Sequence, residues 1–202
     1  MASIGKIIGV NGNLIRVKFE SAVSQNEVAY AKLTQKNKDG KSEVIPLKSE
    51  VIRIRGDYAE LQVFEDTTGL KTGDEVEFTG ELLSVELGPG LLTQVFDGLQ
   101  NPLPKLAEEC GFFLQRGKYL KALPRDKKWA FTPVAKAGDV VVAGDTLGTV
   151  PEGVFTHRIM VPFRLLGKWT VESVSAAGEF TVETVVAKLK NAHGETQDVT
   201  MV

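Results

Sequence analysis

Alternating apolar and polar positions mark the first part of the chain as β-structure. In residues 14–19, Leu-Ile-Arg-Val-Lys-Phe, apolar and basic side chains alternate, which is the pattern of a strand with one buried face. The same alternation returns in residues 51–55, 61–64 and 75–78. Turn residues separate these segments, at Asn11-Gly12, Gly56-Asp57 and residues 72–74. Short strands at this spacing predict a small antiparallel barrel or sandwich.

A different texture follows in residues 80–111. Residues 88–90, Gly-Pro-Gly, predict a rigid bend. Residues 105–110 are preceded by two prolines and followed by Gly111, which predicts one or two helical turns. The stretch is apolar and differs from a flexible Gly/Ser tether, so we expect a structured connection at a domain boundary.

The chain returns to a β pattern from residue 112. Residues 136–140 and 142–146 are near repeats, each a Gly-Asp turn followed by apolar residues. The other predicted elements are a closing strand, a turn and the start of a further strand, in residues 181–189, 191–195 and 199–202.

We therefore predict a mainly β protein, in which a small N-terminal β-barrel is followed by a connecting segment and a second, barrel-sandwich-like β domain. The predicted divisions are the barrel, the connection, the second domain and a final segment, in residues 1–79, 80–111, 112–188 and 189–202.

Composition narrows the class of protein. The 202 residues are 43% hydrophobic and 25% charged, as in an average globular chain. The formal net charge of −2 provides no basic excess for nucleic-acid binding. A lone cysteine, Cys110, excludes an internal disulfide and a Cys-based zinc site. No apolar run is long enough to cross a bilayer and no signal peptide is evident, so we expect a cytosolic protein without membrane insertion.

Asp39-Gly40-Lys41-Ser42 contains the end of a phosphate-binding loop motif. That motif requires another glycine five residues before Gly40, and the residue there is Gln35. The residues that follow do not open a helix. A charged hairpin turn is the favoured interpretation.

The sequence evidence for other catalytic or binding motifs is equally weak. Cys110 with His157 or His193 could form a nucleophile and base, but a helix-end cysteine and surface histidines are favoured. Glu108-Glu109 are adjacent on a short helix and point in different directions, so they indicate a solvated face. Arg55-Gly56-Asp57 matches an adhesion tripeptide but is favoured as a turn. We therefore assign no catalytic, cofactor-binding or metal-binding residue.

The paired Gly-Asp turns at Gly138 and Gly144 resemble half of a biotinyl or lipoyl carrier domain. Such a domain presents a lysine at a tight hairpin, and residues 149–160 contain no lysine. Our hypothesis is a carrier-like fold without the carrier function.

The middle of the chain carries a more specific resemblance. Residues 60–74 are followed by the ordered block at 83–103, which includes Leu-Gly-Pro-Gly-Leu-Leu and Phe-Asp-Gly-Leu-Gln-Asn-Pro-Leu. Together they resemble the N-terminal region of the catalytic A subunit of bacterial V-type and A-type rotary ATPases. The likeness extends over essentially the whole chain, through residues 111–117 and the Gly-Asp repeats.

The resemblance implies a division of labour. Residues 1–79 would form the barrel that joins alternating A and B subunits into a hexameric collar. Residues 88–103 would lead toward the nucleotide-binding core, and residues 112–188 would form the outward-projecting bulge domain that contacts peripheral-stalk subunits. Residues 189–202 would return toward the ATP-binding domain.

The resemblance also implies what this chain lacks. The phosphate loop, its lysine and the Mg²⁺ ligand of the family would lie beyond Val202. The chain is then expected to be a fragment, inactive alone, of a subunit that binds ATP and Mg²⁺, couples ATP turnover to H⁺ or Na⁺ transport, and lies on the cytoplasmic side of the membrane with central and peripheral stalk subunits.

Two departures from the family pattern stand out. A polar insert occupies residues 34–42, and Asn101 stands where an arginine is common. Two alternatives to the family remain open from the residues alone, a self-contained two-module β adaptor without enzymatic activity and a cofactor-carrier domain.

Overall fold

The structure is a computed structural model that describes residues 3–36, 40–111 and 115–202. The chain forms two compact units, and each is built from two separate stretches. Met1–Ser84 and Leu106–Tyr119 form the barrel unit, and Val85–Lys105 and Leu120–Val202 form the two-sheet unit. The helix α1 (Leu103–Cys110) joins two of these stretches.

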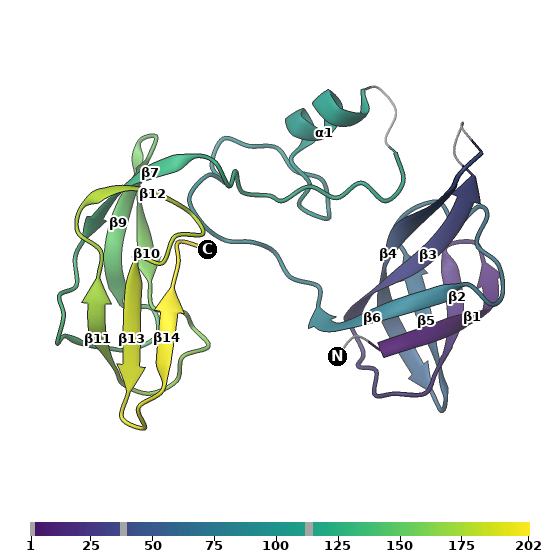
Figure 1. Ribbon diagram of the computed structural model, residues 1–202, viewed down its shortest axis with the longest axis horizontal. Helices are drawn as coiled ribbons and strands as arrows, with labels where there is room; N and C mark the ends of the chain where they lie inside the picture. The colour runs from purple at the N-terminus through teal and green to yellow at the C-terminus, as the bar shows by residue number, and fades with distance from the viewer. Residues whose placement is uncertain (1–2, 37–39, 112–114) are drawn as a thin grey trace. The chain divides into compact units, whose positions relative to one another are not determined.

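The barrel unit contains six antiparallel strands that close on themselves in the order β1-β2-β5-β4-β3-β6 (Figure 1). The strands are β1 (Ser3–Asn11), β2 (Leu14–Phe19), β3 (Glu27–Lys36), β4 (Ser42–Arg55), β5 (Tyr58–Val63) and β6 (Glu75–Leu82). Closure occurs because β6 pairs with both β1 and β3. A closed sheet has no open strand edge, so each strand is paired on both sides.

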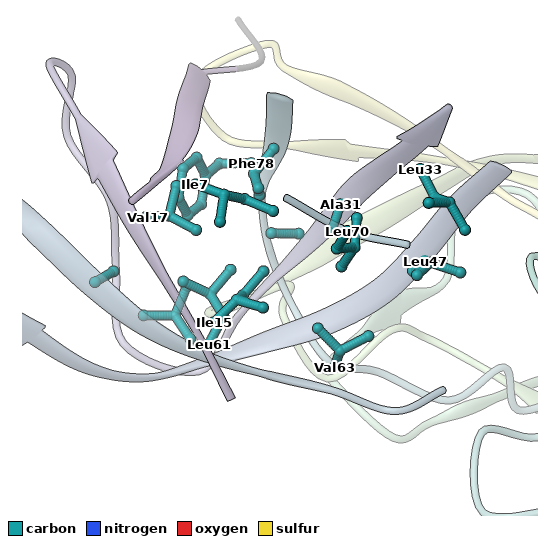
Figure 2. Packing of buried hydrophobic residues seen from close by; sticks show 14 residues of the cluster. Ile7, Ile15, Val17, Ala31, Leu33, Leu47, Leu61, Val63, Leu70 and Phe78 are labelled. Carbon is teal, nitrogen blue, oxygen red and sulfur yellow. The ribbon is translucent and has the colours of Figure 1, made fainter. Parts of the chain in front are cut away.

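Alternation along the strands fills the barrel interior. In β2, Ile15 and Val17 are fully buried while the basic side chains between and after them are exposed. The same inward positions on the other strands bring Ile7, Leu61 and Phe78 into one apolar cluster, which Figure 2 shows in close-up. The predicted barrel is therefore confirmed, with the period-2 pattern as its cause.

Two details of the barrel differ from the prediction. The β1–β2 loop consists of Gly12 and Asn13, one residue later than predicted, because Asn11 pairs with Leu14. Gly12 has a φ of 58°, which suits the first loop position of a tight hairpin. The strand β3 was not predicted, because its inward side chains include the small residues Ala29 and Ala31 and its first residue, Glu27, is a buried acid.

The helix α1 confirms the prediction from proline and glycine spacing. It begins at Leu103, carries Pro104 in its first turn and ends at Cys110. The amide of Gly111 donates to the carbonyl of Ala107 at 2.8 Å, and Gly111 adopts a φ of 69°. Only Leu106 of the helix is buried.

Eight strands in two sheets form the second unit. One sheet has the order β10-β9-β7-β12, from Phe155–Met160, Thr146–Glu152, Lys128–Pro133 and Gly178–Thr181. The other has the order β14-β13-β11-β8, from Thr196–Val199, Ala187–Asn191, Trp169–Val174 and Val140–Val141. Leu147 of β9 packs with Trp169 and Leu189 of the other sheet, so side chains of both sheets share a core. The mainly β fold class predicted from the sequence is confirmed.

The predicted closing strand over residues 181–189 is wrong. The structure has β12 up to Thr181, a turn in which the amide of Thr184 donates to the carbonyl of Thr181, and then β13 from Ala187. The chain changes sheets here, since β12 pairs with β7 and β13 pairs with β11. The β-branched residues of the turn, Val182 and Val186, are buried as core residues, which is why they resembled a strand.

One four-residue turn occurs three times. In residues 71–74, 136–139 and 142–145 the third residue is a glycine with φ between 86° and 94°, and the fourth is an aspartate. In each, Oδ2 of the aspartate accepts the amide of the first residue, at 3.0, 2.8 and 2.8 Å. The aspartate amide in turn donates to the first carbonyl, at 3.2, 3.1 and 3.0 Å. The near repeats seen in the sequence are therefore one turn type that needs glycine at its third position.

Candidate functional site in the connecting segment

Within the predicted connection of residues 80–111, we use the name connecting segment for residues 83–103. Polar side chains rather than strand pairing hold this segment in place. Asp97 Oδ1 accepts the backbone amides of Leu99 and Asn101, at 2.9 and 2.8 Å. Asn101 donates its side-chain amide to Asp97 Oδ2 at 2.8 Å, and its Oδ1 accepts the amide of Leu120 at 2.9 Å. Asn101 is 4% exposed. Asn101 thus links this segment to the next part of the two-sheet unit.

A second link centres on Arg125. Its Nη2 contacts Glu86 Oε1, and its Nε lies 3.1 Å from Glu183 Oε1. Glu86 also exchanges backbone hydrogen bonds with the side chain of Gln100, at 2.7 and 2.8 Å. The side chain of Arg125 is 22% exposed, and those of Glu86 and Glu183 are 35% and 53% exposed, so solvent screens the pair with Glu86 less than the pair with Glu183. They join the connecting segment to the turn between β12 and β13.

The third link is Glu152, at the end of β9. Its Oε1 accepts the amides of Gly90 and Leu92, at 2.6 and 3.1 Å, and its Oε2 lies 3.1 Å from Nδ1 of His157. Glu152 is 6% exposed, so desolvation strengthens these charge-assisted bonds and makes them costly to remove. Sequence reasoning missed Glu152, whose only signal was an acid at the end of an apolar run.

Residues 115–119 return to the barrel unit and form what we call the return strap. Arg116 Nη1 donates to the carbonyl of Thr68 at 2.7 Å, and the amide of Gly117 donates to Glu65. A side chain at Gly117 would place its Cβ 2.5 Å from Ile45 Cγ2. The strap therefore needs glycine at this position to lie against β4.

Tyr119 completes the return strap. Its hydroxyl accepts the backbone amide of Lys48, at 2.7 Å, which satisfies a donor of β4. Burial raises the pKa of Tyr119 well above its ordinary range, and the bond from Lys48 only partly opposes this shift. Tyr30 packs edge-on against the Tyr119 ring, and its own pKa is also raised by burial.

The residues considered for catalysis lie in contacts or positions that do not require a catalytic role. His157 pairs with Glu152, and the backbone amide of His193 donates to Asn191 in an exposed turn. Cys110 is partly buried at the end of α1, where Glu108 and Glu109 are exposed. Within the described residues, no group of three or more His, Cys, Asp and Glu side chains could hold a metal ion. The assignment of no catalytic, cofactor or metal residue stays a prediction.

The short motifs lie at the ends of strands. Lys36 of β3 pairs with Ser42 of β4, while Asp39 lies outside the described residues. Gly56-Asp57 is the β4–β5 turn, and a hydrogen bond from Lys18 lowers the pKa of the Asp57 carboxyl. In the two-sheet unit, Gly153-Val154 joins β9 to β10 and supplies no lysine for a carried cofactor.

Comparison with known proteins identifies the family. Residues 7–80 match the beta-barrel domain of the ATP synthase alpha/beta family, and residues 120–202 match the ATP synthase alpha/beta subunit barrel-sandwich domain. The V-type ATP synthase alpha chain of Treponema denticola is 56% identical over 197 residues, 98% of this chain and 32% of that protein. The chain belongs to the ATP synthase alpha/beta family, and the relatives that it matches are V-type ATP synthase alpha chains.

Other members agree with this placement. The V-type ATP synthase alpha chain of Borreliella burgdorferi is 49% identical over 201 residues, and V-type ATP synthase alpha chain 1 of Treponema pallidum is 51% identical over 197. These alignments cover 100% and 98% of this chain, but 33% and 32% of the relatives. The chain therefore spans about a third of the length of the curated relatives that it matches. The predicted family resemblance is confirmed. Among the residues that the structure describes, no helix is long and apolar enough to span a membrane.

Proposed function

We propose that this chain is the N-terminal, non-catalytic part of the catalytic subunit of an ion-translocating V/A-type rotary ATPase or ATP synthase. The intact subunit would bind ATP and Mg²⁺ and couple ATP turnover to transport of H⁺ or Na⁺. It would act in the head of the complex on the cytoplasmic side of the membrane. The support is the family membership over the whole chain combined with its span of about a third of its relatives.

Within this proposal, the barrel unit joins alternating A and B subunits into a hexameric collar. The observation that carries this assignment is the exposure of three apolar residues of β1, where Ile4, Ile8 and Val10 are 54%, 48% and 38% exposed. Several exposed apolar side chains on one strand favour burial against another protein. On the neighbouring strand β2, the exposed residues Arg16 and Lys18 are basic.

Residues 112–188, most of which belong to the two-sheet unit, are proposed to be the bulge domain, with contacts to peripheral-stalk subunits. The connecting segment is proposed to lead toward the nucleotide-binding core. The connecting segment is held by three polar links, through Asp97, Arg125 and Glu152. These links fit a segment that must keep one conformation at a domain junction. The divisions 1–79, 80–111, 112–188 and 189–202 remain part of this proposal.

The test is assembly of the full-length subunit with its B subunit. Ile8→Lys places a charge on the outer face of β1 and is expected to reduce head assembly about tenfold or more, because burying an unpaired charge is costly. Ile52→Lys is the matched control, because Ile52 is a 39% exposed residue of another barrel strand. Size-exclusion chromatography and MgATP hydrolysis of the assembled head give the readout.

Equal assembly of the two lysine variants would overturn the assignment of β1 to the subunit interface. The 202-residue chain alone is expected to show no MgATP hydrolysis above buffer. Turnover that persists through rigorous purification would contradict the non-catalytic role and favour another function for this chain.

A further inference from the structure

A cavity of about 480 Å³ lies beside the β9–β10 hairpin of the two-sheet unit, and we call it the hairpin cavity. Its walls come from residues 90–94, from residues 122–129 and from the hairpin itself. Pockets for small organic ligands are commonly of this size and combine apolar walls with a few polar groups. The hairpin cavity has both.

One wall contains an indole donor without an acceptor. Trp129 is 5% exposed, and its Nε1 is fully buried with no hydrogen-bond partner among the described residues. The other tryptophan, Trp169, donates to the carbonyl of Leu166 at 3.1 Å. A buried N–H without an acceptor is rare in proteins, because it has lost its bonds to water without replacement.

The charged groups of the hairpin cavity favour an anion. The ammonium group of Lys127 lies 3.9 Å from the centre of the Trp129 ring, and Lys105 also lines the cavity. The one lining carboxylate, Glu152, already accepts two backbone amides and contacts His157. The two lysines therefore outnumber the single carboxylate, and that carboxylate is occupied.

The rim of the cavity is apolar and exposed. Val154 and Phe155, at the tip of the hairpin, are 93% and 62% exposed. Leu92, which lines the cavity from another segment, is 43% exposed. Thr93, which also lines the cavity, has a φ of 66°, a conformation that is strained for a β-branched residue. Strained residues of this kind cluster at ligand sites, and exposed apolar rims favour a ligand with an apolar body.

We propose that the hairpin cavity binds a small organic anion with an aromatic or apolar body. The anionic group is neutralised by Lys105 and Lys127, and the apolar body lies against Val154 and Phe155. This site is separate from the collar assignment, and it needs neither ATP turnover nor subunit assembly.

The probe that tests the proposal is 1-anilinonaphthalene-8-sulfonate, an aromatic sulfonate, titrated into the 202-residue chain and followed by its fluorescence. Lys127→Gln and Lys105→Gln are each expected to weaken binding about fivefold, because each removes one charge from the site. Lys188→Gln is the matched control, since Lys188 is an exposed lysine of β13 outside the cavity.

A neutral analogue, N-phenyl-1-naphthylamine, separates charge recognition from general apolar adsorption. It is expected to bind more weakly than the sulfonate and to respond equally to the Lys127 and Lys188 variants. Circular dichroism of each variant checks that the two-sheet unit remains folded. Absence of sulfonate binding, or equal affinity of the Lys127→Gln and Lys188→Gln variants for the sulfonate, would overturn the proposal.

Discussion

The barrel unit and the two-sheet unit bury their apolar side chains in different architectures. In the barrel, six strands enclose one continuous apolar cluster, and closure leaves no strand edge. The two-sheet unit has two separate apolar clusters and two open sheets, so its chain must switch between sheets. The barrel is therefore specified mainly by strand alternation, whereas the two-sheet unit depends on loops and individual polar links.

Both units nevertheless share three local structural features. Each contains a crowded strand glycine, a buried glutamate that accepts two backbone amides, and at least one Gly-Asp turn. The aromatic residues allow the units to be followed separately, because both tryptophans, Trp129 and Trp169, belong to the two-sheet unit. Tryptophan emission reports on that unit, and hydrogen exchange of strand amides reports on the barrel.

The largest expected effects come from the crowded glycines. A Cβ at Gly148 would lie 2.1 Å from Phe131 Cε2, and a Cβ at Gly5 would lie 2.6 Å from Val17 Cγ1 and 2.7 Å from the carbonyl of Lys18. Gly148→Ala is expected to destabilise the two-sheet unit by about 2–4 kcal/mol, and Gly5→Ala the barrel by a similar amount. Urea unfolding followed by tryptophan emission and by hydrogen exchange measures both.

Gly9→Ala is the control for this pair, because nothing lies within 4 Å of a Cβ at that position of β1. It is expected to change barrel stability by less than about 0.5 kcal/mol. If Gly5→Ala shifted the tryptophan transition as much as the barrel amides, the two units would unfold as one, and the comparison between them would fail.

The buried glutamates are expected to differ. Glu27 uses one oxygen for the amide of Ser24 and the other for Gly80, at 2.8 and 2.6 Å, so a glutamine must leave one amide facing its own N–H₂ group. Glu27→Gln is expected to cost the barrel about 2 kcal/mol. Glu152 receives both amides on one oxygen, so Glu152→Gln can keep both and is expected to cost about 1 kcal/mol.

Denaturant unfolding of the two variants tests this order, with the exposed Glu179→Gln as a control of near-zero effect. A larger loss for Glu152→Gln than for Glu27→Gln would show that the arrangement of oxygens does not decide the cost.

An effect as small as that of Glu152→Gln is expected in the return strap. Tyr119→Phe removes the acceptor of the Lys48 amide and is expected to cost the barrel about 1 kcal/mol at neutral pH. Burial raises the pKa of Tyr119 in the folded state, whereas in the unfolded chain it is about 10. As the pH rises above about 10, the unfolded chain loses this proton first, so the contribution of Tyr119 to stability declines.

The measurement is the difference in urea midpoint between the original chain and Tyr119→Phe, from about pH 8 to about pH 11. The difference isolates Tyr119, because lysine titration is common to both proteins. The advantage of the original chain is expected to shrink across this range. An advantage that grew with pH would contradict a folded-state pKa raised by burial.

Prediction from the sequence succeeded where apolar and polar residues alternate clearly and failed where they do not. Strand β2 was predicted to the residue, since alternation of Ile15 and Val17 with basic residues has one geometrical solution. Strand β3 was missed, because Ala29 and Ala31 carry a weak hydrophobic signal and only the closed barrel makes their small size suitable. Residues 181–189 were taken for one strand, because burial of Val182 and Val186 in a turn has the same composition as burial in a sheet.

The polar links of the connecting segment were not predictable from the residues. Glu86 and Arg125 are 39 positions apart, and Glu152 is 62 positions from Gly90, so no local pattern relates them. The ordered block at 83–103 did signal the family, and the family matches confirmed it. What the block does physically, through Asp97 and Asn101, became visible only in three dimensions.

The sequence by itself determined the Gly-Asp turns and the strands with one clearly alternating face. Local geometry suffices there, because a glycine with positive φ and an alternating strand require only neighbours along the chain. The tertiary structure decided barrel closure, the change of sheets after Thr181, and the partners of the buried Glu27 and Glu152. These depend on which distant backbone donors are removed from water, and that is settled only when the whole core packs.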